Sequence, residues 1–323
     1  MSKQPEWHLG LFVHLPKTAG TSFRYALEQQ KKTLSDYGQL SPQTDSLLLD
    51  TVYEGDFCQA IEQIEKSDVE WLAGHFSLRK YLNFVDVRRV VSFVREPTEQ
   101  VISHYYHSQK LNGFAGSFEE FIRTPKSINV QSRHLGGVPI GLIGYIGITE
   151  LYGESLQLIN RGLQLQLRNV TKNVSEARTD DLLLSDGIDR EAIKKINQHD
   201  VAFYTEARWL HQQRLAFAKS DKPWTYGATR IIQAGREKGT IVGCCFSSTS
   251  EQAVSVDIYK DGKHEATLIA NEFYQEYPKA NFPRHRYIGF RFKSPTADFA
   301  ESQYDVYVSD TKQKLNFEPL VVK

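Results

Sequence analysis

The sequence predicts an α/β fold with a parallel sheet flanked by helices, followed by a small all-β domain. Short apolar runs alternate with segments of helical period through the first two thirds of the chain. After about residue 225 the helical period is nearly absent, and residues of alternating polarity replace it. The 323 residues suffice for one large domain and a smaller one. We therefore expect domains over residues 1–222 and 230–323.

Within the first part, each short apolar run predicts a buried strand and each periodic segment a helix. Pro97 suits the first turn of a helix because it lacks a backbone N–H. The glycine-rich segment 136–147 is interpreted as a loop and not as a dinucleotide site. The expected strands are 9–15, 69–73 and 90–94, and the expected helices are 22–32, 97–109, 150–167, 189–199 and 202–218.

The second part reads as strands joined by turns. A linker is expected near residues 221–229, which contain a proline and a glycine. Asp261-Gly262 is a hairpin turn signal after the alternating run 254–259. The adjacent Cys244 and Cys245 fall in a predicted strand and are expected to be core. No catalytic cluster stands out here, so we expect a glycan-binding module, an assembly module or a lid.

Composition excludes several classes of partner. The chain has 39 basic and 39 acidic side chains, so it is not a nucleic-acid coat and has no polybasic anchor. No apolar run reaches the roughly 18 residues of a membrane span, and no signal peptide is apparent. Three cysteines, an odd number, favour a reduced compartment. We expect a cytoplasmic protein without nucleic-acid or membrane partners, and the oligomeric state stays open.

The stretch FVHLPKTAGTSF, residues 12–23, has the chemistry of a phosphate-binding loop. A strand is followed by Lys17, Gly20, Thr21 and Ser22 and then by a helix. Backbone N–H groups at a helix N-terminus favour an anion, and glycine permits close approach. In the Walker A motif the lysine comes at the end of the loop, whereas here it comes first. A plain strand-loop-helix corner with a surface lysine is the less favoured alternative.

Two other predicted strands also end in polar side chains. Arg95 follows the strand 90–94, and Ser103 lies eight residues later, after a turn and about two turns of helix. These two side chains can face one anion, although Arg95 could instead pair with Glu96 or Glu99. In open α/β sheets ligands bind at the carboxyl ends of the strands, so we expect the side chains at these ends to meet in one crevice.

His75 ends the strand 69–73 in the sequence AGHFS. A lone histidine is more often structural, but a strand end in such a sheet favours a functional role. Lys17, His75 and Arg95 would then face one crevice. A histidine with a pKa near neutrality beside two cations is the layout of a group transferase.

Four segments together resemble the carbohydrate sulfotransferases that use 3′-phosphoadenosine 5′-phosphosulfate (PAPS). They are FVHLPKTAGTSF, AGHFS, FVREPTEQVISHYYH and NVQSRHLGG. The likeness is to the uronosyl or heparan sulfate 2-O-sulfotransferase type and its bacterial relatives, and it covers about residues 8–215. It implies a P-loop-like sulfotransferase fold and sulfation of an acceptor hydroxyl, with a carbohydrate or glycoconjugate as the expected acceptor.

The resemblance also implies roles for individual residues. Arg95 and Ser103 correspond to the family's 3′-phosphate ligands. His75 corresponds to the general base, and Lys17 stabilises the departing phosphate of 3′,5′-ADP. In several relatives another histidine precedes the glycine of the Gly-His pair, where this chain has Ala73. The expected ligands of the 5′-phosphosulfate are Lys17, Thr18, Ala19, Gly20, Thr21 and Ser22.

The acceptor site is less specific in sequence. Each of its candidate residues has a structural alternative, such as a capped loop, a solvated face or helix packing. No aspartate ends the segment VVSFV, where a magnesium ligand of a kinase would be expected, so no metal is expected. The candidate acceptor contacts are Arg79, Tyr106, Gln131 and Arg133.

Two rival functions stay open. One is an ATP-dependent kinase on a similar sheet, against which the order of the loop and the missing aspartate count. The other is a non-catalytic nucleotide- or glycan-binding protein, against which the retention of Lys17, His75 and Arg95 counts. The acceptor could be a polysaccharide, a glycolipid, a small hydroxylated metabolite or a protein tyrosine.

Overall fold

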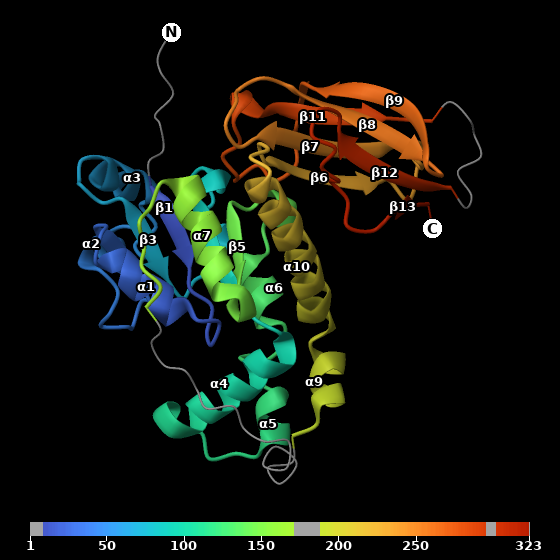
Figure 1. Cartoon of the computed structure of the whole chain (residues 1–323). Helices are drawn as coiled ribbons and strands as arrows, with labels where there is room; N and C mark the ends of the chain where they lie inside the picture. The colour runs from blue at the N-terminus through green and yellow to red at the C-terminus, as the bar shows by residue number, and fades with distance from the viewer. Residues whose placement is uncertain (1–8, 171–187, 295–301, 323) are drawn as a thin grey trace.

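A computed structural model describes residues 9–170, 188–294 and 302–322 (Figure 1). The first part of the chain alternates strands and helices, as expected. Its elements are β1 (Gly10–Val13), α1 (Gly20–Glu28), β2 (Thr33–Asp36), α2 (Ser46–Asp50), α3 (Phe57–Glu65), β3 (Trp71–Gly74), β4 (Val90–Val94), α4 (Pro97–Asn112), α5 (Phe118–Ile122), α6 (Val130–Leu135), β5 (Tyr145–Ile148), α7 (Tyr152–Leu163), α9 (Arg190–Ile196) and α10 (Gln198–Lys219).

The five strands of this part form one parallel sheet in the order β2-β3-β1-β4-β5. β1 therefore lies between β3 and β4, and the loops that follow these three strands leave the same edge of the sheet side by side. β4 begins and ends as expected. β2 was not expected. β5 begins at Tyr145, inside the glycine-rich segment 136–147, so the interpretation of that whole segment as a loop was wrong.

Both faces of the sheet are covered, which explains the continuous apolar runs of its strands. On one face Phe12 of β1 packs in a cluster with Phe23 of α1 and Leu156 of α7. On the other face Val13 belongs to a cluster that includes Ala207 of α10. α4, α5 and α9 instead form a lobe beyond the carboxyl ends of the strands (Figure 1).

The rest of the chain forms two four-stranded antiparallel sheets, ordered β10-β11-β7-β6 and β13-β12-β8-β9. Asp261 and Gly262 have positive φ of 50° and 78° in the turn of the β8–β9 hairpin, which confirms the turn signal. The strands are β6 (Thr225–Ile231), β7 (Ile241–Ser247), β8 (Val254–Lys260), β9 (Lys263–Ala270), β10 (Glu272–Phe273), β11 (Tyr287–Phe292), β12 (Gln303–Val308) and β13 (Leu320–Val321).

The expected linker 221–229 is largely a strand. β6 begins at Thr225, and its Gly227 pairs with Cys245 of β7. Cys244 and Cys245 are both free and fully buried, as the sequence predicted for core residues. One buried cluster contains both Val94 of β4 and Phe246 of β7, so the β-rich part shares a hydrophobic core with the parallel-sheet part.

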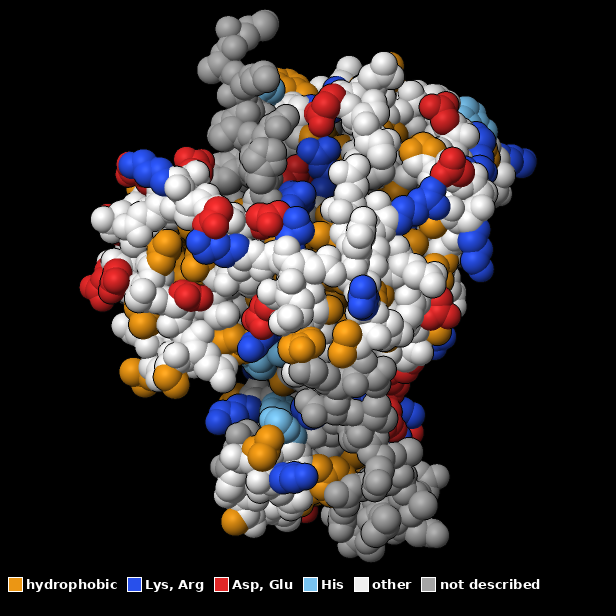
Figure 2. Space-filling model, turned by 60° about the vertical axis from the view of Figure 1, so that its left-hand side comes forward, with side chains coloured by type: hydrophobic (Ala, Val, Ile, Leu, Met, Phe, Trp, Pro, Cys, Tyr) orange, Lys and Arg blue, Asp and Glu red, His pale blue; other side chains and the backbone are white. Residues whose placement is uncertain are grey.

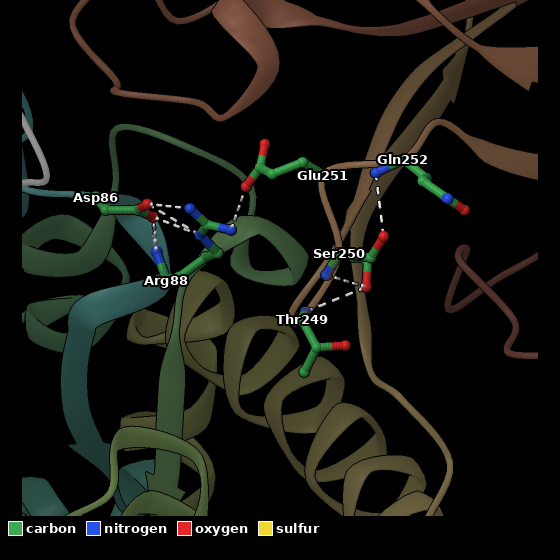
Figure 3. A network of polar contacts seen from close by, with 7 residues as sticks. Asp86, Arg88, Thr249, Ser250, Glu251 and Gln252 are labelled. Atoms are coloured by element: carbon green, nitrogen blue, oxygen red, sulfur yellow. Dashed lines mark hydrogen bonds and ion pairs between the residues drawn. The ribbon is translucent and has the colours of Figure 1, made fainter. Parts of the chain in front are cut away.

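Polar contacts join the two parts at their surface. Arg88, two residues before β4, binds Asp86 at 2.7 Å and reaches Glu251 of the β7–β8 connection at 3.3 Å (Figure 3). Asn281 donates to the carbonyl oxygen of Asn83 at 3.0 Å. In the described ranges, no helix combines the length and the apolar character needed to cross a bilayer.

Candidate functional site

The sheet brings three of the expected site residues to one edge. Lys17 lies in the loop after β1, His75 directly follows β3, and Arg95 directly follows β4. Because β1 pairs with both β3 and β4, these loops are neighbours. Figure 2 shows an indentation between the body of the molecule and its lower lobe, with histidine and basic side chains on both sides.

The loop between β1 and α1 has the backbone geometry of an anion-binding turn. Lys17 and Ala19 both have a φ of 64°, in the left-handed region that non-glycine residues seldom occupy. Ala19 is the N-cap of α1, and its side chain does not cap the helix. The first N–H groups of a helix have no partner within the helix, so the N-terminus of α1 offers donors and a positive dipole end to an anion.

The hydroxyl groups of this loop differ in their exposure and therefore in their role. Thr18 is fully buried, and its Oγ1 donates to the carbonyl oxygen of Leu15 at 3.1 Å, so this hydroxyl holds the loop closed. Ser22 is also buried, whereas Thr21 is exposed in the first turn of α1. Among these three side chains, Thr21 is therefore the most open to a ligand.

The Lys17 side chain reaches from the loop toward α4. Its Nζ lies 3.5 Å from Nδ1 of His107, and Nη1 of Arg95 donates to its carbonyl oxygen at 3.4 Å. Burial, and then the charge of Arg95, lower the pKa of Lys17 from its ordinary value. Because the charge of Arg95 disfavours the charged form of Lys17, an anion bound between the two side chains would be stabilised by both.

Arg95 is held by its backbone. Its N–H donates to Oε1 of Gln131 and its carbonyl oxygen accepts from Nε2, both at 2.9 Å. Its guanidinium lies 3.9 Å from Glu99, the limit of an ion pair, and Glu99 also accepts from Arg190 at 2.7 Å. The alternative pairing of Arg95 with Glu99 is thus present as a long ion pair, and the Arg95 side chain is 24% exposed.

Ser103 lies on the same stripe of α4 as Glu99 and His107, because residues four apart share a helix face. Glu99 contacts Arg95 and His107 contacts Lys17, so the stripe faces the loop after β1. Ser103 is half-buried between these two contacts. Ser103 therefore lies on the face of α4 that is turned toward the loop after β1, and its role as a phosphate ligand stays a prediction.

Most of the segment NVQSRH lies in α6, and the contacts of Gln131 do not fit the expected role in acceptor binding. Gln131 is fully buried with both ends of its amide bound to Arg95, so it positions Arg95 and offers no free group to a sugar. Asp200 of α10 accepts from the backbone N–H groups of Gln131 at 3.0 Å and of Ser132 at 2.8 Å. Arg133 is exposed, so burial does not prevent its side chain from contacting an acceptor.

The other expected acceptor contacts lie on either side of this region. Arg79 is exposed, and its aliphatic part lies so close to Gly137 that a Cβ there would come within 2.8 Å of Arg79 Cγ. Tyr106 is half-buried and packs 5.2 Å from Tyr105, ring to ring, in the aromatic cluster of α4 and α5. Packing between the helices therefore explains why a tyrosine stands at position 106 without a contact to the acceptor.

His75 is placed by the end of β2. Its N–H donates to the carbonyl oxygen of Asp36 at 2.9 Å, and a Cβ on Gly74 would lie 1.8 Å from that oxygen. Close strand packing therefore requires the glycine of the Gly-His pair, and the backbone bond fixes the start of the segment that carries the His75 side chain. The buried carboxylate of Asp36 accepts from Lys80 at 2.6 Å and from Tyr81 at 2.7 Å, which fixes this corner of the sheet. Sequence reasoning missed Asp36, because its partners Lys80 and Tyr81 come from a distant segment.

His75 is exposed, and its ring packs 4.5 Å from the ring of His14 and 4.9 Å from the ring of Tyr37, centroid to centroid. Burial, and then the charges of His134, Arg24, His104 and His107, lower its pKa to about 4. The expected pKa near neutrality is therefore wrong for the ligand-free protein. At neutral pH the ring is uncharged, so it can accept a proton but cannot donate one as an acid.

His14, at the end of β1, is a site residue that sequence reasoning missed. Its ring lies 4.5 Å from that of His75 and 6.3 Å from that of Tyr37. A Cβ on Gly20 would come within 2.1 Å of His14 Cδ2, so glycine is required beside this ring. The available signal was a histidine three residues before Lys17, in the same loop.

Two cavities lie elsewhere. The larger, of about 380 Å³, opens between α10 and the C-terminal sheets and is lined by Glu206, Arg230 and Tyr274 among others. The smaller, of about 30 Å³, lies beside Tyr145 and Arg214. Neither includes a strand-end residue of the candidate site, which is an open indentation of the surface.

Comparison with known proteins does not name this arrangement: no family model, no curated protein and no solved structure matches the chain. The candidate site therefore stands on its own geometry. That geometry is an uncapped helix N-terminus, two neighbouring cations at Lys17 and Arg95, and the neutral ring of His75 at the same sheet edge.

Proposed function

We propose that this protein transfers a sulfuryl group from PAPS to a hydroxyl group of an acceptor, with a carbohydrate or glycoconjugate as the acceptor class. The observation that carries the proposal is the meeting of Lys17, His75 and Arg95 at the ends of three adjacent parallel strands. The resemblance of these loops to PAPS-dependent sulfotransferases supports the identity of the donor.

The residues present fit an anionic nucleotide. The N-terminus of α1 and the Lys17 ammonium would hold the 5′-phosphosulfate, and Arg95 with Ser103 would hold the 3′-phosphate. The fit rests on two features of the chain. The backbone is left-handed at Lys17 and Ala19 beside a helix start without a side-chain cap, and the Arg95 guanidinium lies against the carbonyl oxygen of Lys17, close enough for its charge to lower the pKa of the Lys17 ammonium. PAPS supplies the activated sulfuryl group.

His75 has the properties of the proton acceptor. As the acceptor oxygen forms its bond to sulfur, the hydroxyl proton moves to the neutral imidazole, and the bond from sulfur to the bridging oxygen breaks. The electron pair of that bond stays on the phosphate oxygen of 3′,5′-ADP, where Lys17 stabilises the growing charge. Neighbouring negative charge would raise the pKa of His75 from its ligand-free value and make it a stronger base.

A kinase is the second candidate. Arg95 directly follows β4, so a basic side chain occupies the place where a P-loop kinase would have an acidic magnesium ligand.

A non-catalytic binding protein is the third candidate. This hypothesis explains the anion-binding loop but gives no role to the neutral histidine beside it. The sulfotransferase hypothesis uses all three strand ends.

The decisive experiment is a screen of hydroxylated acceptors with PAPS labelled in its sulfuryl group. The panel would contain polysaccharides, glycolipids, small hydroxylated metabolites and tyrosine peptides, each with the unchanged protein and with Lys17→Ala. The exposed Lys66→Ala serves as the matched control. We expect label on one acceptor class with the unchanged protein and with Lys66→Ala, and none with Lys17→Ala. Transfer of phosphate from ATP instead would establish the kinase.

A further inference from the structure

His14 is a buried histidine whose Nδ1 has a hydrogen-bond partner and whose Nε2 has none among the residues that the structure describes. The residue is 7% exposed, and its Nδ1 lies 3.3 Å from the hydroxyl oxygen of Tyr37. Within the described ranges Nε2 makes no hydrogen bond. The edge of the ring that carries Nε2 faces the start of α1, because a Cβ on Gly20 would lie 2.5 Å from that nitrogen.

The neighbours of Tyr37 determine which nitrogen of His14 carries the proton. Nη1 of Arg24 donates to the Tyr37 oxygen at 2.5 Å, and a guanidinium can only donate. Tyr37 therefore accepts from Arg24 and has its own proton left for His14 Nδ1. The reverse assignment would give the tyrosine oxygen two donors and leave its proton without an acceptor in the described structure. The network is satisfied only if Nδ1 accepts and Nε2 holds the proton.

The charge state agrees with this assignment. Burial, and then the charges of His75 and Arg24, hold the pKa of His14 well below its ordinary value, so the ring is neutral at neutral pH. Arg24 is itself fixed by Glu28 one helical turn later, at 2.8 Å. A neutral ring with a fixed tautomer keeps one N–H in a constant direction.

We infer that His14 is a neutral hydrogen-bond donor whose Nε2–H binds an anionic oxygen at the N-terminus of α1, with Arg24 and Tyr37 setting its tautomer. The identity of that anion as the 5′-phosphosulfate of PAPS rests on the proposed function. His14 thus adds a side-chain donor to the backbone N–H groups of the loop, and the glycine at position 20 lets the ring reach them.

The tautomer can be measured without any ligand. Nitrogen-proton correlation spectra of the full protein report which ring nitrogen of each histidine is protonated, and His14→Gln identifies the His14 signals. We expect a neutral ring with its proton on Nε2, and a loss of this single tautomer in Tyr37→Phe. A proton on Nδ1 in the unchanged protein would overturn the inference whatever the protein binds.

The contact is tested by calorimetry with PAPS and with inorganic pyrophosphate. We expect His14→Leu to weaken binding roughly 10- to 100-fold, as for a hydrogen bond to a charged group. His14→Gln, which keeps an N–H donor, should retain most of the affinity, and the exposed His199→Leu should bind as the unchanged protein does.

The outcomes separate the two proposals. Unchanged affinity in a folded His14→Leu, or no binding of either anion by the unchanged protein, overturns the role of His14. Binding of pyrophosphate that depends on His14, without binding of PAPS, supports His14 as a donor and contradicts the proposed function. Should His14→Leu fail to fold, the tautomer and the His14→Gln affinities still decide the matter.

Discussion

Arg95 and Gln131 close a ring of two hydrogen bonds, in which the backbone N–H and the carbonyl oxygen of Arg95 both bind the amide of Gln131 at 2.9 Å. The backbone N–H of Gln131 donates in turn to the carboxylate of Asp200 at 3.0 Å. The turn between β4 and α4 is thereby tied through α6 to α10. This connection fixes the backbone from which the Arg95 side chain leaves the sheet.

Replacing Gln131 by leucine should therefore weaken both stability and anion binding. The change leaves two backbone groups of Arg95 buried without partners, which we expect to lower the free energy of unfolding by about 2–3 kcal/mol. Denaturant unfolding measures this value, and calorimetry with 3′,5′-ADP should show weaker binding. Gln43→Leu, at an exposed position, is the control. Equal unfolding midpoints for both variants would contradict the role of Gln131.

Arg95 should confer preference for a nucleotide with a 3′-phosphate. We expect the unchanged protein to bind 3′,5′-ADP more tightly than 5′-AMP, and Arg95→Ala to remove most of the difference, since a charge-assisted bond contributes roughly 1.5–3 kcal/mol. Calorimetry gives both affinities. The exposed Arg123→Ala should leave the preference intact. Equal affinities of the two nucleotides for the unchanged protein would rule out this role.

His75→Ala should lower kcat and leave nucleotide affinity nearly unchanged, because the ring acts on the acceptor's proton. Removal of a general base typically costs about 10²–10⁴-fold in rate. The measurements are kcat, the nucleotide Kd and the melting temperature on one preparation, with His199→Ala for comparison. A variant that keeps more than about a third of kcat would exclude His75, since that loss is under about 1 kcal/mol of barrier. His104, His107 and Glu96 would then be the next candidates.

The histidines also predict a pH dependence of stability. Burial lowers the pKa of His104 and His211 to about 4, from an ordinary value of 6.5. Between these values the unfolded chain binds more protons than the folded one, so the free energy of unfolding should fall as the pH falls through this window. Urea unfolding of the nucleotide-free protein at several pH values measures the trend. Constant stability down to about pH 4 would contradict these shifts.

Activity should survive a metal chelator. The motivation is the basic Arg95 directly after β4, where a kinase needs an acidic ligand for magnesium. Turnover with PAPS is measured before and after addition of EDTA. Loss of turnover that magnesium restores would favour the kinase hypothesis over sulfuryl transfer.

The sequence by itself determined the parallel-sheet class and three loops of the candidate site. Both predictions depend on residues that are adjacent in the sequence. An apolar run is long enough for a strand, and the residues that follow it form the loop. Lys17, His75 and Arg95 could be placed at strand ends because both faces of the sheet are buried, which makes the runs continuous and their ends visible. The Asp261-Gly262 turn is equally local.

Only the tertiary structure decided which residues support the site and in what chemical state. Gln131 lies 36 residues from Arg95, and Tyr37 lies 23 residues from His14, so no local pattern joins these partners. The pKa of His75 depends on burial and on charges from other elements, so the value expected from an isolated histidine was too high. β6 was hidden in an apparent linker because a proline and a glycine mark turns locally, whereas pairing with β7 determines the strand.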